Sequence, residues 1–91
     1  MLEIEKLFLY YSGMGKIHSS ENWLIRVQGN EHPPVHVHVI CPEGKAAVYL
    51  DGRVINSGVP AGTLRRAQEW IADNHTLIND EWIRMNNPAE R

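Results

Sequence analysis

The chain has 91 residues, of which 43% are hydrophobic, and its formal net charge is −2 when the histidines are neutral. A chain of this length corresponds to one domain, and this hydrophobic content excludes a wholly disordered polypeptide. The slightly acidic balance excludes a protein that holds nucleic acid through bulk positive charge, although a local basic patch remains compatible with RNA binding. The sequence therefore predicts one folded domain over residues 1–91.

The cysteine content and the hydropathy of the chain indicate the cellular compartment in which the protein is expected. Cys41 is the single cysteine, so no disulfide can form within the chain, which favours a reducing compartment. The apolar run over residues 7–11 is too short for a signal peptide, and no stretch is long enough to span a bilayer. We therefore expect a cytoplasmic protein without a membrane partner.

The first part of the chain has the periodicity of strands. Residues 2–11 combine alternation with an apolar run and predict a strand, with a short helix as the alternative. Residues 22–28 alternate strictly, with Trp23, Ile25 and Val27 on one face, which predicts a half-buried strand. A polar turn follows and leads into two consecutive prolines, which favour an extended backbone.

Residues 35–40 have the clearest strand pattern, in which three valines alternate with His36, His38 and an isoleucine. Strand geometry places the valines on one face of the predicted sheet and the histidines on the other. Residues 46–50 and 53–56 predict two further strands, which a tight turn joins.

The C-terminal third has helical periodicity. Pro60 suits the first turn of a helix, and an apolar stripe recurs at intervals of three and four residues. The members of this stripe are Leu64, Ala67 and Ile71. A second helix is predicted to carry Leu77, Ile78, Trp82 and Met85, and the tail over residues 87–91 is predicted to fray. Strands followed by helices are typical of the α+β class, so we expect an antiparallel sheet of three to five strands with both helices packed on one face.

The histidine-rich segment carries the most chemistry. His36 and His38 project from the same strand face with Cβ atoms about 7 Å apart, and two imidazoles at this spacing can share one metal ion. His32 can supply a third nitrogen if the proline turn folds back, and Asp51 can supply an oxygen. Three protein ligands with one open position are typical of catalytic zinc. The three histidines, with Asp51 as a further oxygen ligand, therefore predict a site for zinc or another divalent metal.

Two other interpretations of the same histidines remain open. His36 and His38 can act as base and acid on a phosphodiester without metal, with Lys45 or Arg26 stabilising the phosphate charge. Histidines on a half-exposed strand can also have a structural role or contact a partner protein. Composition and spacing do not decide between these roles, and they leave open whether the chain is an enzyme.

Three segments of the chain resemble one prokaryotic family of small proteins. The first is HPPVHVH at residues 32–38, which follows the form His-x-Pro-Pro-His-x-His with Val35 in place of the second proline. The second is AAVYLD at residues 46–51, a strand with alanine that closes on an acidic residue. The third is the helical segment LRRAQEWIADNH at residues 64–75, followed by Trp82. These segments are similar to the family known as DUF4160, a domain of unknown function.

The resemblance runs from residue 23 to about residue 82, so residues 1–17 extend beyond the family pattern. It implies an α+β fold. Genes of this family often stand beside a gene for another small protein, and some carry a toxin–antitoxin label. The resemblance therefore implies a binding module that acts through a small protein partner. The alternatives are a small histidine-based or metal-dependent ribonuclease or other hydrolase, and a phage or mobile-element inhibitor that acts by surface contact.

Overall fold

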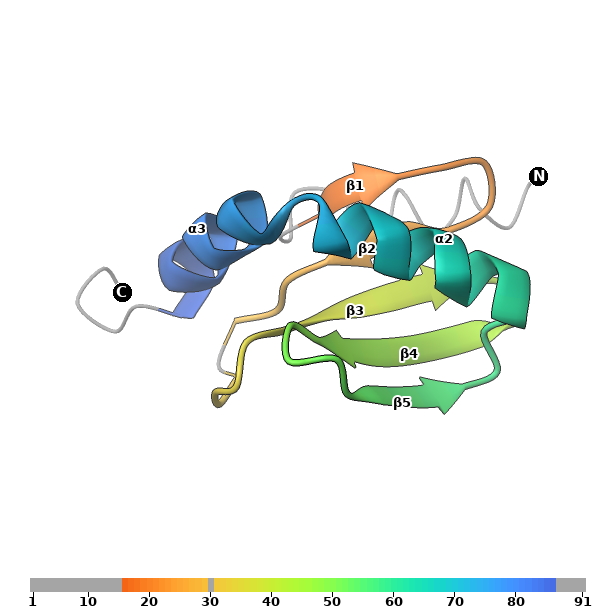
Figure 1. The fold of residues 1–91 in the computed structure, drawn as a ribbon, viewed down its shortest axis with the longest axis horizontal. Coiled ribbons are helices and arrows are strands. Elements are labelled where there is room, and N and C mark those ends of the chain that lie inside the picture. The colour runs from red at the N-terminus through yellow and green to blue at the C-terminus, as the bar shows by residue number, and fades with distance from the viewer. Residues whose placement is uncertain (1–15, 30, 87–91) are drawn as a thin grey trace.

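The described part of the chain is a five-stranded antiparallel sheet followed by two helices (Figure 1). The computed structural model describes residues 16–29 and 31–86. The strands are β1 (Lys16–Ser19), β2 (Leu24–Arg26), β3 (His36–Cys41), β4 (Gly44–Tyr49) and β5 (Val54–Ser57), and the helices are α2 (Ala61–Ala72) and α3 (His75–Asn86). The strands lie in the order β1-β2-β3-β4-β5, and each pairs antiparallel with its neighbour in the chain. The predicted α+β class, with the sheet before the helices, is confirmed.

The strand predictions differ in how well they match. β3, β4 and β5 lie close to the predicted ranges, whereas the predicted strand over residues 22–28 is shortened to the three residues of β2. β1 was not predicted, because its sequence KIHS holds a single aliphatic residue and shows no alternation. The predicted strand over residues 2–11 and the predicted frayed tail over residues 87–91 lie outside the described residues.

The sheet has one apolar face and one mixed face, and β3 shows both. Val37 and Val39 have no exposed surface and belong to the core beneath the helices, whereas His36, His38 and Ile40 alternate to the opposite face. Burying an aliphatic side chain of this size stabilises the fold by roughly 1.5–3 kcal/mol, so the two valines account for much of the stability of β3 in the sheet. The buried core consists of Trp23, Ile25, Val27, Val37, Val39, Cys41, Ala46, Val48, Val59, Ala67, Ile71, Ile78 and Trp82.

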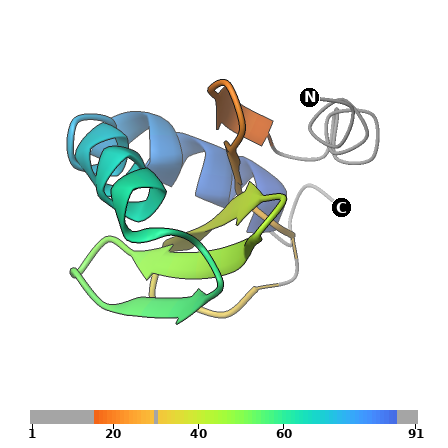
Figure 2. The same cartoon turned by 90° about the vertical axis from the view of Figure 1, so that its right-hand side faces the viewer.

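Both helices contribute side chains to this core (Figures 1 and 2). α2 begins directly after Pro60, which occupies the N-cap position and not the predicted first turn, and the helix buries Ala67 and Ile71. The amide of Asn74 donates to the carbonyl oxygen of Trp70 (2.7 Å) and so satisfies the end of α2 before α3 begins. Within residues 16–29 and 31–86, no helix is long and apolar enough to cross a membrane.

α3 lies beside the start of β3 (Figure 1). β2 ends at Arg26, which is the register partner of His38, so the first residues of β3 have no neighbour from β2. Gly29 and Glu31, which follow β2, approach the end of α3 at this corner. A Cβ atom on Gly29 would lie 3.2 Å from the carbonyl oxygen of Met85, which is tighter than ordinary contact, so a glycine suits this approach.

Candidate metal centre

Three side chains converge at this corner of the molecule. Glu31 comes from the loop between β2 and β3, and His36 and His38 come from the outward face of β3. The Nε2 atom of His38 lies 2.6 Å from Oε1 of Glu31, and the Nε2 atom of His36 lies 3.4 Å from the same oxygen. One ligand atom from each residue lies within 4.8 Å of the other two. Two imidazole nitrogens and one carboxylate oxygen therefore face a common point.

The orientation of His36 is fixed by its surroundings. Its Nδ1 lies 2.9 Å from the carbonyl oxygen of Pro34, and because a carbonyl oxygen only accepts, Nδ1 carries the proton. The ring is 6% exposed and packs against the rings of Tyr49 and Trp82, with centroid distances of 4.5 Å and 5.2 Å. In its neutral form His36 therefore turns the lone pair of Nε2 toward the carboxylate of Glu31. Two acceptors that face each other favour a cation between them, either a proton or a metal ion.

His38 is half-buried and meets the same carboxylate. The 2.6 Å distance from its Nε2 to Glu31 is that of a short, charge-assisted hydrogen bond. Its ring lies 5.3 Å from the ring of His36 in an edge-on arrangement, so the two imidazoles approach Glu31 from different directions. Oε1 of Glu31 thus lies next to Nε2 of both histidines.

Asn86, at the end of α3, holds the loop that carries Glu31. Its Oδ1 accepts a hydrogen bond from the backbone N–H of Glu31 (2.8 Å). Its Nδ2 donates to the carbonyl oxygens of Gln28 (3.0 Å) and Trp82 (3.2 Å). The bonds to Glu31 and Gln28 link residues 55 and 58 positions apart in the sequence, so the position of Glu31 depends on where α3 ends.

A second set of contacts reaches Glu31 from β2 and the residues after it. With its side-chain nitrogen turned toward Glu31, the amide of Gln28 donates to Oε1 of Glu31 (3.2 Å) and accepts from Nη1 of Arg26 (3.3 Å). Arg26 is 8% exposed and lies opposite His38 in the sheet register. The carboxylate is therefore surrounded by donors on several sides, as expected for a partly buried charge.

The electrostatics of the cluster favour an ionised carboxylate beside a neutral imidazole. Burial alone raises the pKa of Glu31, but the hydrogen bond from His38 and the charges of His38 and His36 outweigh it and hold the pKa below its ordinary value. Burial lowers the pKa of His38, and this outweighs the attraction of Glu31, while the charges of His36 and Arg26 lower the pKa further. Metal ligands must be in these deprotonated forms.

The distances can be compared with those around a tetrahedral metal ion. Bonds of about 2.0–2.1 Å separate the ligand atoms of such an ion by about 3.3–3.4 Å. The separation of 3.4 Å between His36 and Glu31 already has this value, whereas the hydrogen-bonded pair of His38 and Glu31 at 2.6 Å would have to open by about 0.8 Å. Two histidines and one glutamate are a ligand set of catalytic zinc sites, and the Nδ1 bond of His36 to a carbonyl is the outer support that such ligands have.

The residues that the sequence singled out lie in different places. His36 and His38 come together, but His32 is exposed and lies outside the group formed with Glu31. Asp51 lies in the turn between β4 and β5, where its Oδ1 accepts from the backbone N–H of Arg53 (3.0 Å). His32 and Asp51 are therefore not part of this cluster, and a metal role for them stays a prediction.

Glu31 was not identified from the sequence. It immediately precedes the histidine-rich segment, and that adjacency is the one signal that could have found it. Strand periodicity relates His36 to His38, but it says nothing about a loop residue before two prolines. Arg26 and Lys45, the predicted phosphate contacts, both belong to strands at the outward face: Arg26 lies opposite His38, and Lys45 lies opposite Ile40.

Comparison with known proteins gives a family but no described relative. No curated protein and no solved structure matches the chain. One family model matches residues 22–83, a range that includes Glu31, His36 and His38 and ends three residues before Asn86. Because this match covers more than half of the 91 residues, the chain belongs to the family described as a domain of unknown function, DUF4160.

Proposed function

We propose that this protein is a metal-binding module in which Glu31, His36 and His38 hold one divalent transition metal, with zinc as the first candidate. The observation that carries the proposal is the convergence of Nε2 of His36 and Nε2 of His38 on one oxygen of Glu31. The Nδ1 bond to Pro34 supports it, since it leaves Nε2 of His36 as the ligand atom.

Three protein ligands leave a tetrahedral ion with one open position. A zinc ion held by Glu31, His36 and His38 would make a bound water acidic enough to act as a nucleophile near neutral pH, which is the chemistry of zinc hydrolases. The proposal therefore favours a metal-dependent hydrolase over metal-free histidine catalysis. In the metal-free alternative Nδ1 of His38 would act as the base, because its Nε2 is engaged with Glu31.

Calorimetry with zinc on metal-stripped protein tests the proposal. We expect one ion per chain and a large loss of affinity in His36→Ala, His38→Ala and Glu31→Gln. Removal of an outer support typically costs 10–100-fold, so removal of a ligand should cost more than about 100-fold. Glu31→Gln is the sharpest of the three variants, because it keeps the size of the side chain and removes only its charge.

His32→Ala is the matched control, since it removes a neighbouring imidazole that lies outside the cluster. Its zinc affinity should stay within about twofold of that of the unmodified chain, a change of less than about 0.4 kcal/mol. If His32→Ala abolished zinc binding while Glu31→Gln preserved it, the ligand set proposed here would be wrong. A lack of binding of zinc, nickel and manganese at micromolar concentration would remove the metal proposal altogether.

A second candidate function is contact with a small protein partner, as in a toxin–antitoxin-like pair. The observation that favours it is β5, which has β4 as its single neighbour in the described sheet and carries Ile55 at 58% exposure. An open edge strand can pair with a strand of another protein. Co-expression with the product of a neighbouring gene, followed by size-exclusion chromatography, tests it. Ile55→Lys should weaken the complex, and an unchanged complex would exclude this edge.

A further inference from the structure

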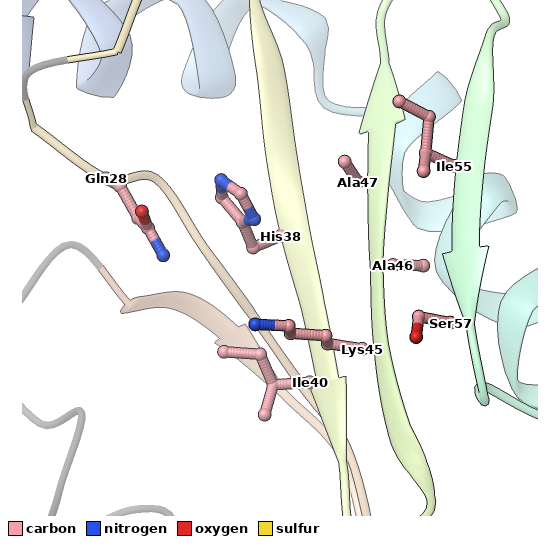
Figure 3. A pocket seen from close by; sticks show the side chains of 8 residues that line it. All are labelled: Gln28, His38, Ile40, Lys45, Ala46, Ala47, Ile55 and Ser57. Carbon is pink, nitrogen blue, oxygen red and sulfur yellow. The ribbon is translucent and has the colours of Figure 1, made fainter.

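The outward face of the sheet holds a pocket next to the metal centre (Figure 3). Its volume is about 300 Å³, and β3, β4 and β5 supply most of its wall. Ile40, Ala47 and Ile55 provide apolar surface, and His38 forms part of the same wall. His38 is thus shared between the pocket and the proposed metal site, which brings the two features side by side.

The charge of this pocket comes from Lys45. Its side chain crosses β3 and carries its amine toward the side where His38 and Gln28 lie (Figure 3). Among residues 16–29 and 31–86, no carboxylate forms an ion pair with this amine, and no hydrogen bond holds it. Among the described residues that line the pocket there is no acidic side chain. A cation without a counter-charge at the rim of an apolar pocket is complementary to an anionic ligand.

The remaining polar groups of the wall fit the same ligand. Ser57 offers a hydroxyl group that can donate to an oxyanion. Arg26 lies beside His38 on the neighbouring strand and the same face, and its charge adds to the positive potential there. Ile40 is the register partner of Lys45, and Ala47 and Ile55 lie in the neighbouring row of the sheet beside His38. The pocket therefore places apolar surface next to a charged group, which suits a molecule with a charged head and an apolar body.

We propose that this pocket binds a small organic phosphate. The phosphate lies against the amine of Lys45 beside His38, and the organic group lies on Ile40, Ala47 and Ile55. The proposal deepens the proposed metal function through the shared His38, but Lys45 and the apolar wall do not depend on a bound metal.

The test uses inorganic phosphate and phenyl phosphate as probes, titrated by calorimetry into the full chain with and without zinc. Phenyl phosphate should bind more tightly than inorganic phosphate, because it also buries an apolar ring. Lys45→Gln should weaken phenyl phosphate at least about tenfold, the loss expected for one charge-assisted hydrogen bond, and should leave zinc affinity unchanged. Ile55→Ser should reduce the preference for phenyl phosphate and leave the affinity for inorganic phosphate unchanged.

Arg65→Gln is the matched control, because it removes one exposed positive charge from α2, away from the outward face. It should leave binding of both probes unchanged. Equal weakening by Lys45→Gln and Arg65→Gln would mean attraction to overall charge and would overturn the proposal. Zinc binding without any binding of phenyl phosphate would also overturn it, while the metal proposal would stand. Phenyl phosphate binding that depends on Lys45 in a chain that takes up no zinc would support the pocket and overturn the metal proposal alone.

Discussion

The two faces of β3 are built on different principles. On the face toward the helices, Val37 and Val39 pack among many apolar neighbours and have no exposed surface. On the outward face, His36 and His38 are held by a few directed contacts, above all the bond to Pro34 and the shared oxygen of Glu31. Apolar packing is non-directional and spread over many atoms, whereas hydrogen bonds depend on single partners. Changes on the first face should therefore alter stability, and changes on the second should alter binding.

The largest expected effect is on stability, at the core face. Ile71 on α2 is 3% exposed and belongs to the core. Ile71→Ala should lower the free energy of unfolding by roughly 2–5 kcal/mol, because it leaves a cavity that the core cannot fill completely. Urea denaturation measures this loss. Ile71→Val should lower the free energy of unfolding by about 0.5–1.5 kcal/mol, and it can be measured even if the alanine variant does not fold. Folded Ile71→Val should bind zinc with unchanged affinity, and a large loss of affinity there would contradict the separation of the two faces.

The next effect concerns Asn86, which connects α3 to the metal centre. Asn86→Ala removes the acceptor for the N–H of Glu31 and the donor to Gln28 and Trp82. We expect zinc affinity to fall about 10–100-fold, the range for groups that orient a ligand without touching the metal. Asn79→Ala, an exposed site on the same helix, is the control and should change nothing. If both variants bound zinc equally well, Asn86 would hold the fold without positioning Glu31.

The pH dependence of stability is a smaller effect with a defined sign. His38 has a folded-state pKa below its usual value of 6.5, and Glu31 has one below its usual value of 4.5. A lowered pKa means that the unfolded chain binds protons first as pH falls. The stabilisation from each group is therefore complete above its usual value and is lost as pH falls through the lower, folded-state pKa. Metal-stripped protein should lose stability below about pH 6.5 through His38 and again below about pH 4.5 through Glu31.

Urea denaturation at a series of pH values measures this dependence. His18 also has a pKa lowered by burial and contributes with the same sign, so the comparison needs His38→Gln and His18→Gln in parallel. His38→Gln should remove the part of the stability loss below about pH 6.5 that His38 causes. A stability that increased as pH fell from 7.5 to 5.5 would contradict the direction for both histidines.

The smallest effect tests an exposed contact behind His36. The guanidinium of Arg53 lies 4.0 Å from the centre of the Tyr49 ring, whose other neighbour is His36. Arg53→Ala should lower the free energy of unfolding by about 0.5–1 kcal/mol, since this cation–π contact is exposed to water. Thermal denaturation measures it. A loss of zinc affinity in this variant would show that the support of His36 extends farther along the outward face than the direct contacts indicate.

The helices and the last three strands were predictable because their signals are local. Alternation of valine and histidine defines β3, and the spacing of Ala67 and Ile71 defines the buried side of α2. Leu64 belongs to the same predicted stripe, yet it is only half-buried, because it packs at the margin of the core. β1 gave no signal, since a short strand with one aliphatic residue, at the edge of the sheet that the structure describes, depends on its neighbour β2 for its conformation.

For the candidate site, strand periodicity was enough to predict that His36 and His38 share a face, because side chains two positions apart on a strand point the same way. The order of strand and helix patterns also determined the class of the fold. The third member of the cluster, Glu31, depends on the packing of the folded chain. Glu31 meets the histidines because Asn86, 55 residues away in the sequence, holds its loop against α3. Hydrogen bonds across such separations leave no periodic pattern in the chain, so the meeting of Glu31, His36 and His38 became evident only in three dimensions.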